Sequence, residues 1–259
     1  MHKIYTTIGE HAFEVTADSA NFMNLFANHF SSLKKVPDQP VDMVVHIHGG
    51  YGTPLVTSDF SITEESRKLI FRRDDYLIDI DPDYHSANLY VYNGLALKQA
   101  FINLYSSFIV FHSWGLLVHG EYVVNNGLAH LLCGESAPSV SPESDNPAQI
   151  LPDEVVLIKI SPEGIRIFDS PFGHEAAAKH SCGSNPIGSV HFIQQAFQNK
   201  QMKIGRTYSL LRLLDTVFYW PHNTEQTKRV ITMLRQFVHA TPVYTDYFQK
   251  NKTMKELIS

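Results

Sequence analysis

An apolar segment that runs directly into a glycine and a group of serines constrains this sequence more than any other stretch. Residues 128–133 read Leu-Ala-His-Leu-Leu-Cys, and Gly134 and Ser141 then stand where a phosphate-binding loop of the pattern G-x-x-x-x-G-K-[ST] begins and ends. In such a loop, backbone N–H groups surround phosphate oxygens and the lysine reaches the β and γ oxygens of a nucleotide. Here Ser139 replaces the second glycine and Val140 replaces the lysine. The spacing predicts a strand followed by a phosphate loop that has lost its cation.

The segments on either side of this loop carry related signals. Upstream, an apolar strand is predicted to end in His119-Gly120, and a two-residue turn at Asn125-Asn126 leads into the strand before the loop. Downstream, Asp153 and Glu154 begin a β-branched, apolar strand. This order resembles the C-terminal domain of HPr kinase/phosphorylase and its HPr-kinase-like relatives, which share the phosphoenolpyruvate-carboxykinase type of P-loop fold. The resemblance covers roughly residues 76–258 and continues through Asp169-Ser-Pro-Phe172, a strand at 188–194, two helices and Thr241-Pro-Val-Tyr244.

The resemblance implies a role for each matching residue. One carboxylate of the family's acidic pair binds Mg²⁺ and the other assists proton transfer, so Asp153 is the expected metal ligand and Glu154 its catalytic neighbour. His119 is expected near the reacting phosphate. The expected nucleotide contacts are Gly134, Ser136, Ser139 and Ser141. Two simpler interpretations stay open: a Pro-Asp-Glu turn before a strand, and a strand histidine that lines a pocket.

Several substitutions oppose conventional nucleotide binding at this loop. Losing the lysine removes a charge-assisted contact worth about 1.5–3 kcal/mol. Pro138 removes a backbone donor, and Glu135 adds a negative charge beside the anion site. Pro142 and Pro147 oppose the helix that normally follows the loop and points its dipole at the phosphates. We therefore expect no α-helix over residues 137–152 and no bound cofactor.

Three functional hypotheses follow from this pattern. The first is a degenerate kinase (a pseudokinase) that acts as an accessory or regulatory protein and binds a protein or peptide partner. The second is an active ATP-dependent serine kinase of the HPr-kinase type, with Mg-ATP as cofactor and with Lys179 or Arg206 in place of the missing lysine. The third is a small-ligand-binding domain that reuses the pocket.

Composition narrows the class of protein. A formal net charge of −5 gives no basic footprint for nucleic acid. The most apolar stretch, residues 108–118, is interrupted by His112 and Ser113 and falls short of the ~20 residues that span a bilayer. Cys133 and Cys182 are too few for a disulfide framework, and no signal-peptide pattern begins the sequence. We expect a cytoplasmic protein without nucleic-acid or membrane partners.

Periodicity predicts an α/β fold. The resemblance implies that an HPr-kinase-like β core with flanking helices occupies residues 76–259, preceded by a smaller α+β section, residues 1–75, or continuous with it as one domain. Asp18 or Ser19 is predicted to cap a first helix. His46 and His48 share one face of a predicted strand at 41–48, a spacing that can bind a transition metal, although no third ligand is placed. Further strands are predicted at 68–71, 76–80, 87–92 and 155–160, and further helices at 95–111, 207–220 and 224–239.

Overall fold

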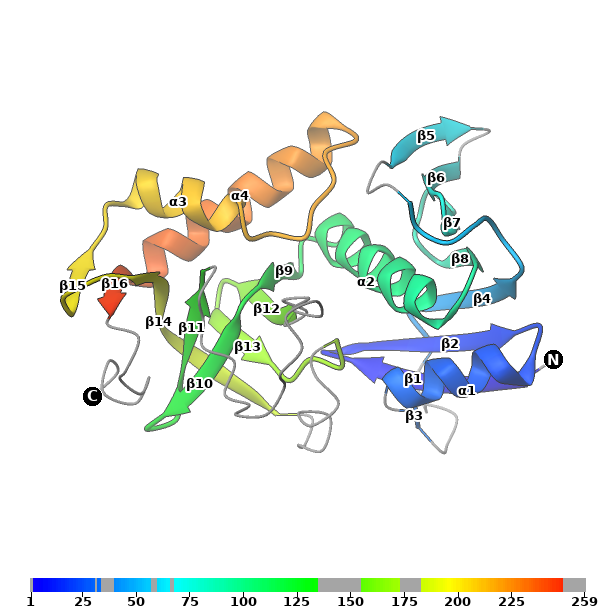
Figure 1. Cartoon of the computed structure of the whole chain (residues 1–259), viewed down its shortest axis with the longest axis horizontal. Coiled ribbons are helices and arrows are strands. Elements are labelled where there is room, and N and C mark those ends of the chain that lie inside the picture. The colour runs from blue at the N-terminus through cyan, green and yellow to red at the C-terminus, as the bar shows by residue number, and fades with distance from the viewer. Residues whose placement is uncertain are drawn as a thin grey trace. The chain divides into compact units, whose positions relative to one another are not determined.

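The computed structural model describes residues 2–30, 32–33, 40–56, 60–65, 68–134, 155–172 and 183–248. These residues form helices and two mixed sheets (Figure 1), so the predicted α/β class is confirmed. The described chain separates into two compact units. Unit 1 contains the residues up to His112 together with 170–172 and Tyr219–Thr227, and unit 2 contains the remainder.

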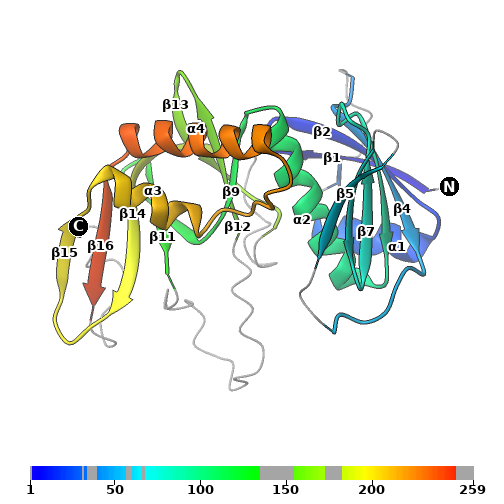
Figure 2. The same cartoon turned by 90° about the horizontal axis from the view of Figure 1, so that it is seen from above.

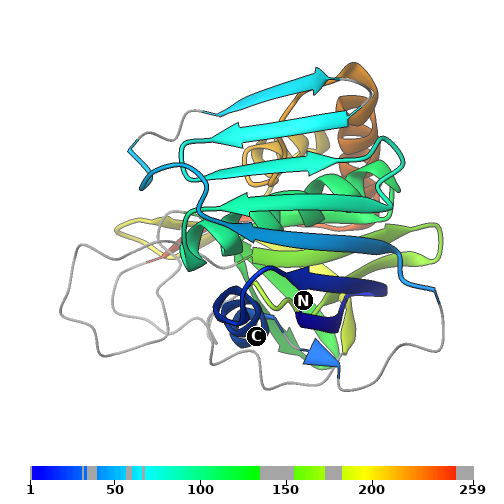
Figure 3. The same cartoon turned by 90° about the vertical axis from the view of Figure 1, so that its right-hand side faces the viewer.

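Unit 1 is built on an eight-stranded sheet in the order β3-β1-β2-β4-β8-β7-β6-β5, whose strands lie side by side in Figure 3. Parallel pairing of β2 with β4 and of β4 with β8 joins an N-terminal hairpin to a three-hairpin meander. The bounds of its elements are β1 (His2–Ile8), β2 (His11–Ala17), α1 (Ala20–His29), β3 (Ser32–Leu33), β4 (Met43–Gly49), β5 (Ser61–Glu65), β6 (Lys68–Arg73), β7 (Tyr76–Ile80), β8 (Ser86–Val91) and α2 (Gly94–Phe111).

The core of unit 1 lies between this sheet and α2. Phe13 of β2 is fully buried, and its ring meets the rings of Phe101 and Phe108 from α2 edge to face. By length and composition α2 also passes as a possible membrane span, but 67% of that stretch is buried inside the structure. Burial of this extent is typical of the core helix of a globular domain. Ser19 rather than Asp18 caps α1, because its Oγ accepts a hydrogen bond from the backbone N of Phe22 at 3.3 Å.

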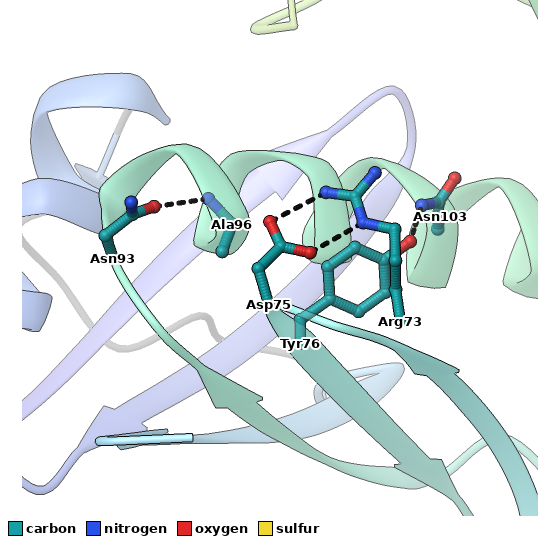
Figure 4. A network of polar contacts seen from close by, with 6 residues as sticks. All are labelled: Arg73, Asp75, Tyr76, Asn93, Ala96 and Asn103. Carbon is teal, nitrogen blue, oxygen red and sulfur yellow. Dashed lines mark hydrogen bonds and ion pairs between the residues drawn. The ribbon is translucent and has the colours of Figure 1, made fainter. Parts of the chain in front are cut away.

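A polar network ties the hairpin of β6 and β7 together beside α2 (Figure 4). Arg73 donates from Nε and Nη2 to the two oxygens of Asp75, at 2.6 and 2.9 Å, and its guanidinium lies 4.3 Å from the ring centroid of Tyr76. The Tyr76 hydroxyl accepts a hydrogen bond from Nδ2 of Asn103 on α2 at 2.7 Å. The domain boundary expected between residues 75 and 76 thus falls inside a hairpin of unit 1, and the chain passes to unit 2 only after His112.

Unit 2 contains the second sheet, with the path β10-β11-β14-β13-β12-β9, and with β16 paired to β14 and β15 to β16. Strands β14, β16 and β15 can be followed in Figure 2. The bounds of its elements are β9 (Gly115–His119), β10 (Glu121–Asn125), β11 (Leu128–Cys133), β12 (Val155–Ser161), β13 (Gly164–Phe168), β14 (Ser184–Gln195), β15 (Lys200–Lys203), α3 (Arg206–Leu214), α4 (Thr224–Ala240) and β16 (Val243–Phe248).

Two local predictions in unit 2 need correction. The turn between β10 and β11 is Asn126-Gly127, not Asn125-Asn126, with φ angles of 51° and 78°. A two-residue hairpin turn of this kind requires positive φ at both positions, which asparagine followed by glycine supplies. The helix predicted over 207–220 ends at Leu214, because the next residues pair with β9 instead: His119 N donates to Thr216 O, and Phe218 N donates to Leu117 O.

The strand order of the resembled family implies that β11 and β12, the strands before and after the loop segment, are neighbours in the sheet. This expectation is wrong, because the two strands are not paired. β14 and β13 lie between β11 and β12 in the sheet. The twelve residues of β14 explain the difference, since its N-terminal part pairs with β13 and the following residues pair with β11. β11 and β12 nevertheless belong to one sheet, and the end of β11 lies near the start of β12 because both contact the end of β9 and the residue after it.

Candidate functional site

The ends of β9, β11 and β12 gather at one corner of unit 2. Val155, the first residue of β12, pairs with His119, the last residue of β9. The next residue, Gly120, lies against β11: a Cβ there would stand 2.5 Å from the Leu132 carbonyl oxygen and 3.3 Å from Cys133 Sγ. We call His119, Gly120, Cys133, Gly134 and Val155 the glycine corner. It brings the start of the loop segment near the start of β12, although the two strands are not paired.

Gly134 at this corner is required by the packing of the sheet. Its φ is +141°, in a region that side chains rarely adopt, and a Cβ would stand 2.5 Å from the carbonyl oxygen of Ile193 on β14. The backbone of the loop's first residue therefore passes too close to β14 for any side chain. This contact accounts for the glycine without a bound phosphate.

His119 is exposed at the corner and is held against an aromatic side chain. Its ring stacks on Phe218, with 3.6 Å between the centroids and 27° between the planes. Its backbone N–H donates to the carbonyl oxygen of Thr216 at 2.7 Å. The segment after α3 thus fixes the imidazole that the sequence pattern places near a reacting group.

Cys133 faces the helices of unit 2 and is chemically protected there. Its side chain is fully buried, and desolvation raises the pKa of the thiol to about 12, although the Arg212 charge and a hydrogen bond with Thr216 oppose the rise. A thiol with this pKa carries almost no thiolate at neutral pH, so Cys133 is not set up as a nucleophile.

Arg212 on α3 is a cation near the start of the loop that the sequence pattern did not identify. Its guanidinium lies 4.6 Å from the ring centroid of Phe192, and Phe192 pairs in register with Cys133 on the parallel strand β11. Of the two cations expected from sequence, Arg206 is the exposed first residue of α3, and Lys179 lies outside the described residues. Arg212 was missed because only the register of β11 and β14 brings it near Cys133.

A chain of short hydrogen bonds crosses three strands elsewhere in unit 2. Asp246 Oδ2 lies 2.5 Å from His191 Nδ1, His191 Nε2 lies 2.6 Å from Ser189 Oγ, and the same Oγ lies 2.6 Å from His130 Nδ1. β16, β14 and β11 contribute these residues, which we call the polar relay. Ser189, His191 and Asp246 are buried, whereas His130 is only half-buried.

The order Asp246–His191–Ser189 is that of a catalytic triad, but two features argue against a nucleophilic serine. Ser189 is only 6% exposed, and its hydroxyl is shared between two imidazoles. Burial and, secondly, the His191 charge lower the pKa of His130, which favours a neutral ring. One direction of donation makes every bond of the chain, from His130 Nδ1 to Ser189, from the Ser189 hydroxyl to His191 Nε2, and from His191 Nδ1 to Asp246. The relay therefore joins three strands through one chain of hydrogen bonds, while the second carboxylate oxygen of Asp246, Oδ1, is buried with no hydrogen-bond partner among the described residues.

Sequence reasoning missed the polar relay for a clear reason. Ser189 and His191 are two residues apart and so share one face of a strand, which the sequence alone indicates. Asp246 and His130 stand more than 50 residues away along the chain and join them only through the pairing of β16 and β11 with β14.

The other predicted site residues divide into two groups. Ser136, Ser139, Ser141, Asp153 and Glu154, with the helix-free stretch 137–152, lie outside the described residues. His46 and His48 are described and each has a partner on the edge of β2: His46 Nδ1 lies 2.6 Å from Thr16 Oγ1, and His48 Nδ1 lies 2.7 Å from Asp18 Oδ2. Within the described residues, no group of three or more His, Cys, Asp and Glu side chains is arranged to hold a metal ion.

Comparison with known proteins adds no family to this geometry. No protein-family model matches the chain, and no curated protein matches its sequence. A function is therefore inferred from the glycine corner and from the residues of the loop that follows it.

Proposed function

We propose that this protein is a degenerate HPr-kinase-like protein of the cytoplasm that binds a protein or peptide partner and does not transfer phosphate from ATP. The observation that carries the proposal is the glycine corner. It keeps the two close backbone approaches at Gly120 and Gly134, while the sequence places Val140 where a phosphate loop has its lysine. The scaffold of the site is retained and its main cation is absent from the motif.

The chemistry of the corner supports a non-catalytic role. A phosphate loop stabilises three or more negative oxygens with backbone donors and a lysine, and Mg²⁺ takes most of its remaining ligands from the phosphates and water. Without the lysine, the phosphates are weakly held and Asp153 has no tightly bound ion to serve. Among the described side chains of the glycine corner, the Cys133 thiol is buried and protonated, and the His119 ring is stacked on Phe218.

The partner class follows from the resemblance. HPr-kinase-like relatives also occur as accessory proteins in peptide-modification systems, so the retained scaffold would present a surface to a protein or peptide. This step is an analogy between folds. Asp153→Asn should accordingly leave partner binding nearly intact, because the carboxylate is not needed to hold a metal.

A specific observation favours one second candidate, an active kinase with a relocated cation. Arg212 lies over Phe192, the residue paired with Cys133, and so brings a positive charge beside the start of the loop. In that case Arg212 would bind the phosphates, Asp153 or Glu154 would bind Mg²⁺ and act as base, and His119 would lie near the transferred phosphoryl group.

A phosphoryl-transfer assay separates the two candidates. The purified chain is incubated with ATP labelled at the γ-phosphate, Mg²⁺ and a set of serine-containing peptides. We expect no labelled peptide and no labelled protein. Transfer to a serine that is lost in both Arg212→Ala and His119→Ala, but kept in the exposed control Arg235→Ala, would contradict the proposal and identify an active kinase.

A further inference from the structure

The segment that forms β15 and α3 differs in charge from the rest of the protein. No acidic residue occurs between Glu175 and Asp215, although the whole chain carries 26 acidic residues against 21 basic ones. Four basic residues fall in the described part of this interval: Lys200, Lys203, Arg206 and Arg212. Within the described residues none of them forms an ion pair with a carboxylate.

The same segment also exposes large apolar side chains. Phe197 is 95% exposed, Met202 42%, Tyr208 51% and Leu211 53%. These four residues fall within 15 positions of a chain whose other large apolar residues are mostly buried. Exposed apolar side chains rimmed by charge are typical of interaction surfaces.

The pairing of the strands places Met202 on the face of the sheet that α3 covers. Thr245 of β16 pairs with Phe192 on one side and with Met202 on the other, so the three side chains share a face of the sheet. Arg212 of α3 lies over Phe192, so this is the face that α3 covers. Met202 therefore lies on the same face as Phe192, two strands away on β15.

α3 begins beside β15. Only Ile204 and Gly205 separate the two elements, and Ile204 N donates to the Val243 carbonyl oxygen at 3.0 Å. Figure 2 shows β15 at the edge of the sheet with α3 following it. Tyr208 and Leu211 lie three residues apart on the helix and form one exposed stripe. We call Lys200, Met202, Arg206, Tyr208 and Leu211 the basic-apolar face.

We propose that the basic-apolar face is the docking site for an acidic segment of a partner protein, one that alternates carboxylates with apolar side chains. This inference rests on the proposed function and assigns the partner's chemistry. Lys200 and Arg206 would meet the carboxylates, and Met202, Tyr208 and Leu211 would meet the apolar side chains. Lysines on an edge strand also discourage aggregation, but that role alone does not explain four exposed apolar side chains beside them.

An acidic protein segment fits this face better than other polyanions. The protein as a whole carries a net charge of −5, so a large polyanion such as a nucleic acid or an anionic membrane meets a net repulsion from the protein. A short peptide contacts only the face itself. Its apolar residues would also bury the exposed side chains, which a phosphate backbone cannot do.

The probe is a fluorescein-labelled 12-residue peptide that alternates glutamate with leucine and phenylalanine, titrated with the full chain and followed by anisotropy. We expect saturable binding that weakens with added salt and weakens about tenfold in Lys200→Glu/Arg206→Glu. The matched control Lys228→Glu/Arg235→Glu reverses two exposed charges on α4 and should bind like wild type. Met202→Ser/Leu211→Ser should also weaken binding, and a peptide with lysine in place of glutamate should not bind.

Three results would overturn the docking site. These are no saturable binding of the acidic peptide, equal weakening by the α4 control, and tighter binding of single-stranded RNA or phosphatidylserine vesicles than of the peptide. Failure of the proposed function looks different. If the protein transfers phosphate from ATP to serine, it is a kinase and the proposed function fails, whether or not the peptide binds. If it neither transfers phosphate nor binds the peptide, the proposed function stands and only the docking site is wrong.

Discussion

At the scale of single residues, Gly134 and Val140 carry different information. The carbonyl oxygen of Ile193 leaves no room for a side chain at residue 134, so packing in the sheet is enough to require a glycine there. Val140 replaces a lysine whose purpose in such a loop is to bind phosphate. A motif can therefore keep its glycine for structural reasons after it has lost its chemistry.

Gly134→Ala should destabilise the protein by about 1–3 kcal/mol, because the new Cβ meets the Ile193 carbonyl and the positive φ is strained. The matched control is Gly205→Ala, at a position with φ of −72° and open space around it, where the change should be small. Urea unfolding of both variants measures the difference. Equal effects of the two substitutions would show that the close approach to β14 does not require a glycine.

The serine of the polar relay should matter for stability more than its size suggests. Ser189→Ala leaves His191 Nε2 and His130 Nδ1 without their shared partner, which should cost about 1–3 kcal/mol. Ser184→Ala on the same strand, whose hydroxyl accepts a hydrogen bond from the exposed Arg166, should cost much less. The free energies of unfolding of the two variants, measured at pH 7, test this prediction. If Ser189→Ala is as stable as the wild type, the relay does not stabilise the sheet.

His11 gives unit 1 a pH dependence with a definite sign. Burial lowers the pKa of its ring to about 4, against the weaker opposing effect of Asp42, and the ring lies 3.2 Å from the Tyr105 hydroxyl through Nδ1. The unfolded chain binds the proton near pH 6.5 and the folded chain only near 4, so the stabilisation is complete above pH 6.5 and is lost as pH falls toward 4. The loss should be on the order of 3 kcal/mol.

Denaturant unfolding of the wild type and of His11→Gln between pH 7.5 and 4 tests this expectation. The variant should lack the part of the slope that lies between pH 6.5 and 4, whatever its stability at pH 7. Parallel curves for the two proteins would show that another group titrates in that range.

At the scale of elements, long periodic segments could be predicted from the sequence and pairings could not. α2 and β4 have strong 3.6- and 2-residue periods and were found within two residues of their ends. The β1–β2 hairpin was missed, since its turn at Gly9 joins two seven-residue strands that are rich in threonine and other polar residues. The predicted α3 was too long, because the helical periodicity continues to Trp220 whereas the backbone after Leu214 forms hydrogen bonds with β9. Insertion of β14 between β11 and β13 depends on contacts far apart in sequence, as does the polar relay.

At the scale of the whole molecule, the chain passes repeatedly between its two units. Residues 170–172 and Tyr219–Thr227 belong to unit 1, although their neighbours in sequence belong to unit 2. Phe172 is fully buried in unit 1, with its ring 5.5 Å from that of Tyr105 and 5.7 Å from that of Phe30. No single cut in the sequence separates the units, so the boundary expected between residues 75 and 76 from the resemblance does not separate them.

Phe172→Ala should therefore destabilise unit 1, by about 3–5 kcal/mol. The same change at Phe197, which is 95% exposed, should cost less than about 0.5 kcal/mol. Hydrogen exchange of the intact chain locates the effect: amides of β1, β2 and α2 should exchange faster in the Phe172 variant. Faster exchange confined to β11 and β14 would contradict the assignment of this residue to unit 1.

The most direct test of the proposed degenerate phosphate site is the melting temperature of the intact protein with and without millimolar Mg-ATP. A site filled at 100 times its dissociation constant would stabilise the fold by about 2.7 kcal/mol and raise the melting temperature by several degrees. We predict no shift for the wild type, and none for Ser139→Gly/Val140→Lys, because Pro142 and Pro147 still oppose the helix that completes a phosphate site. A rise of several degrees in the wild type that disappears in Asp153→Asn would contradict the account.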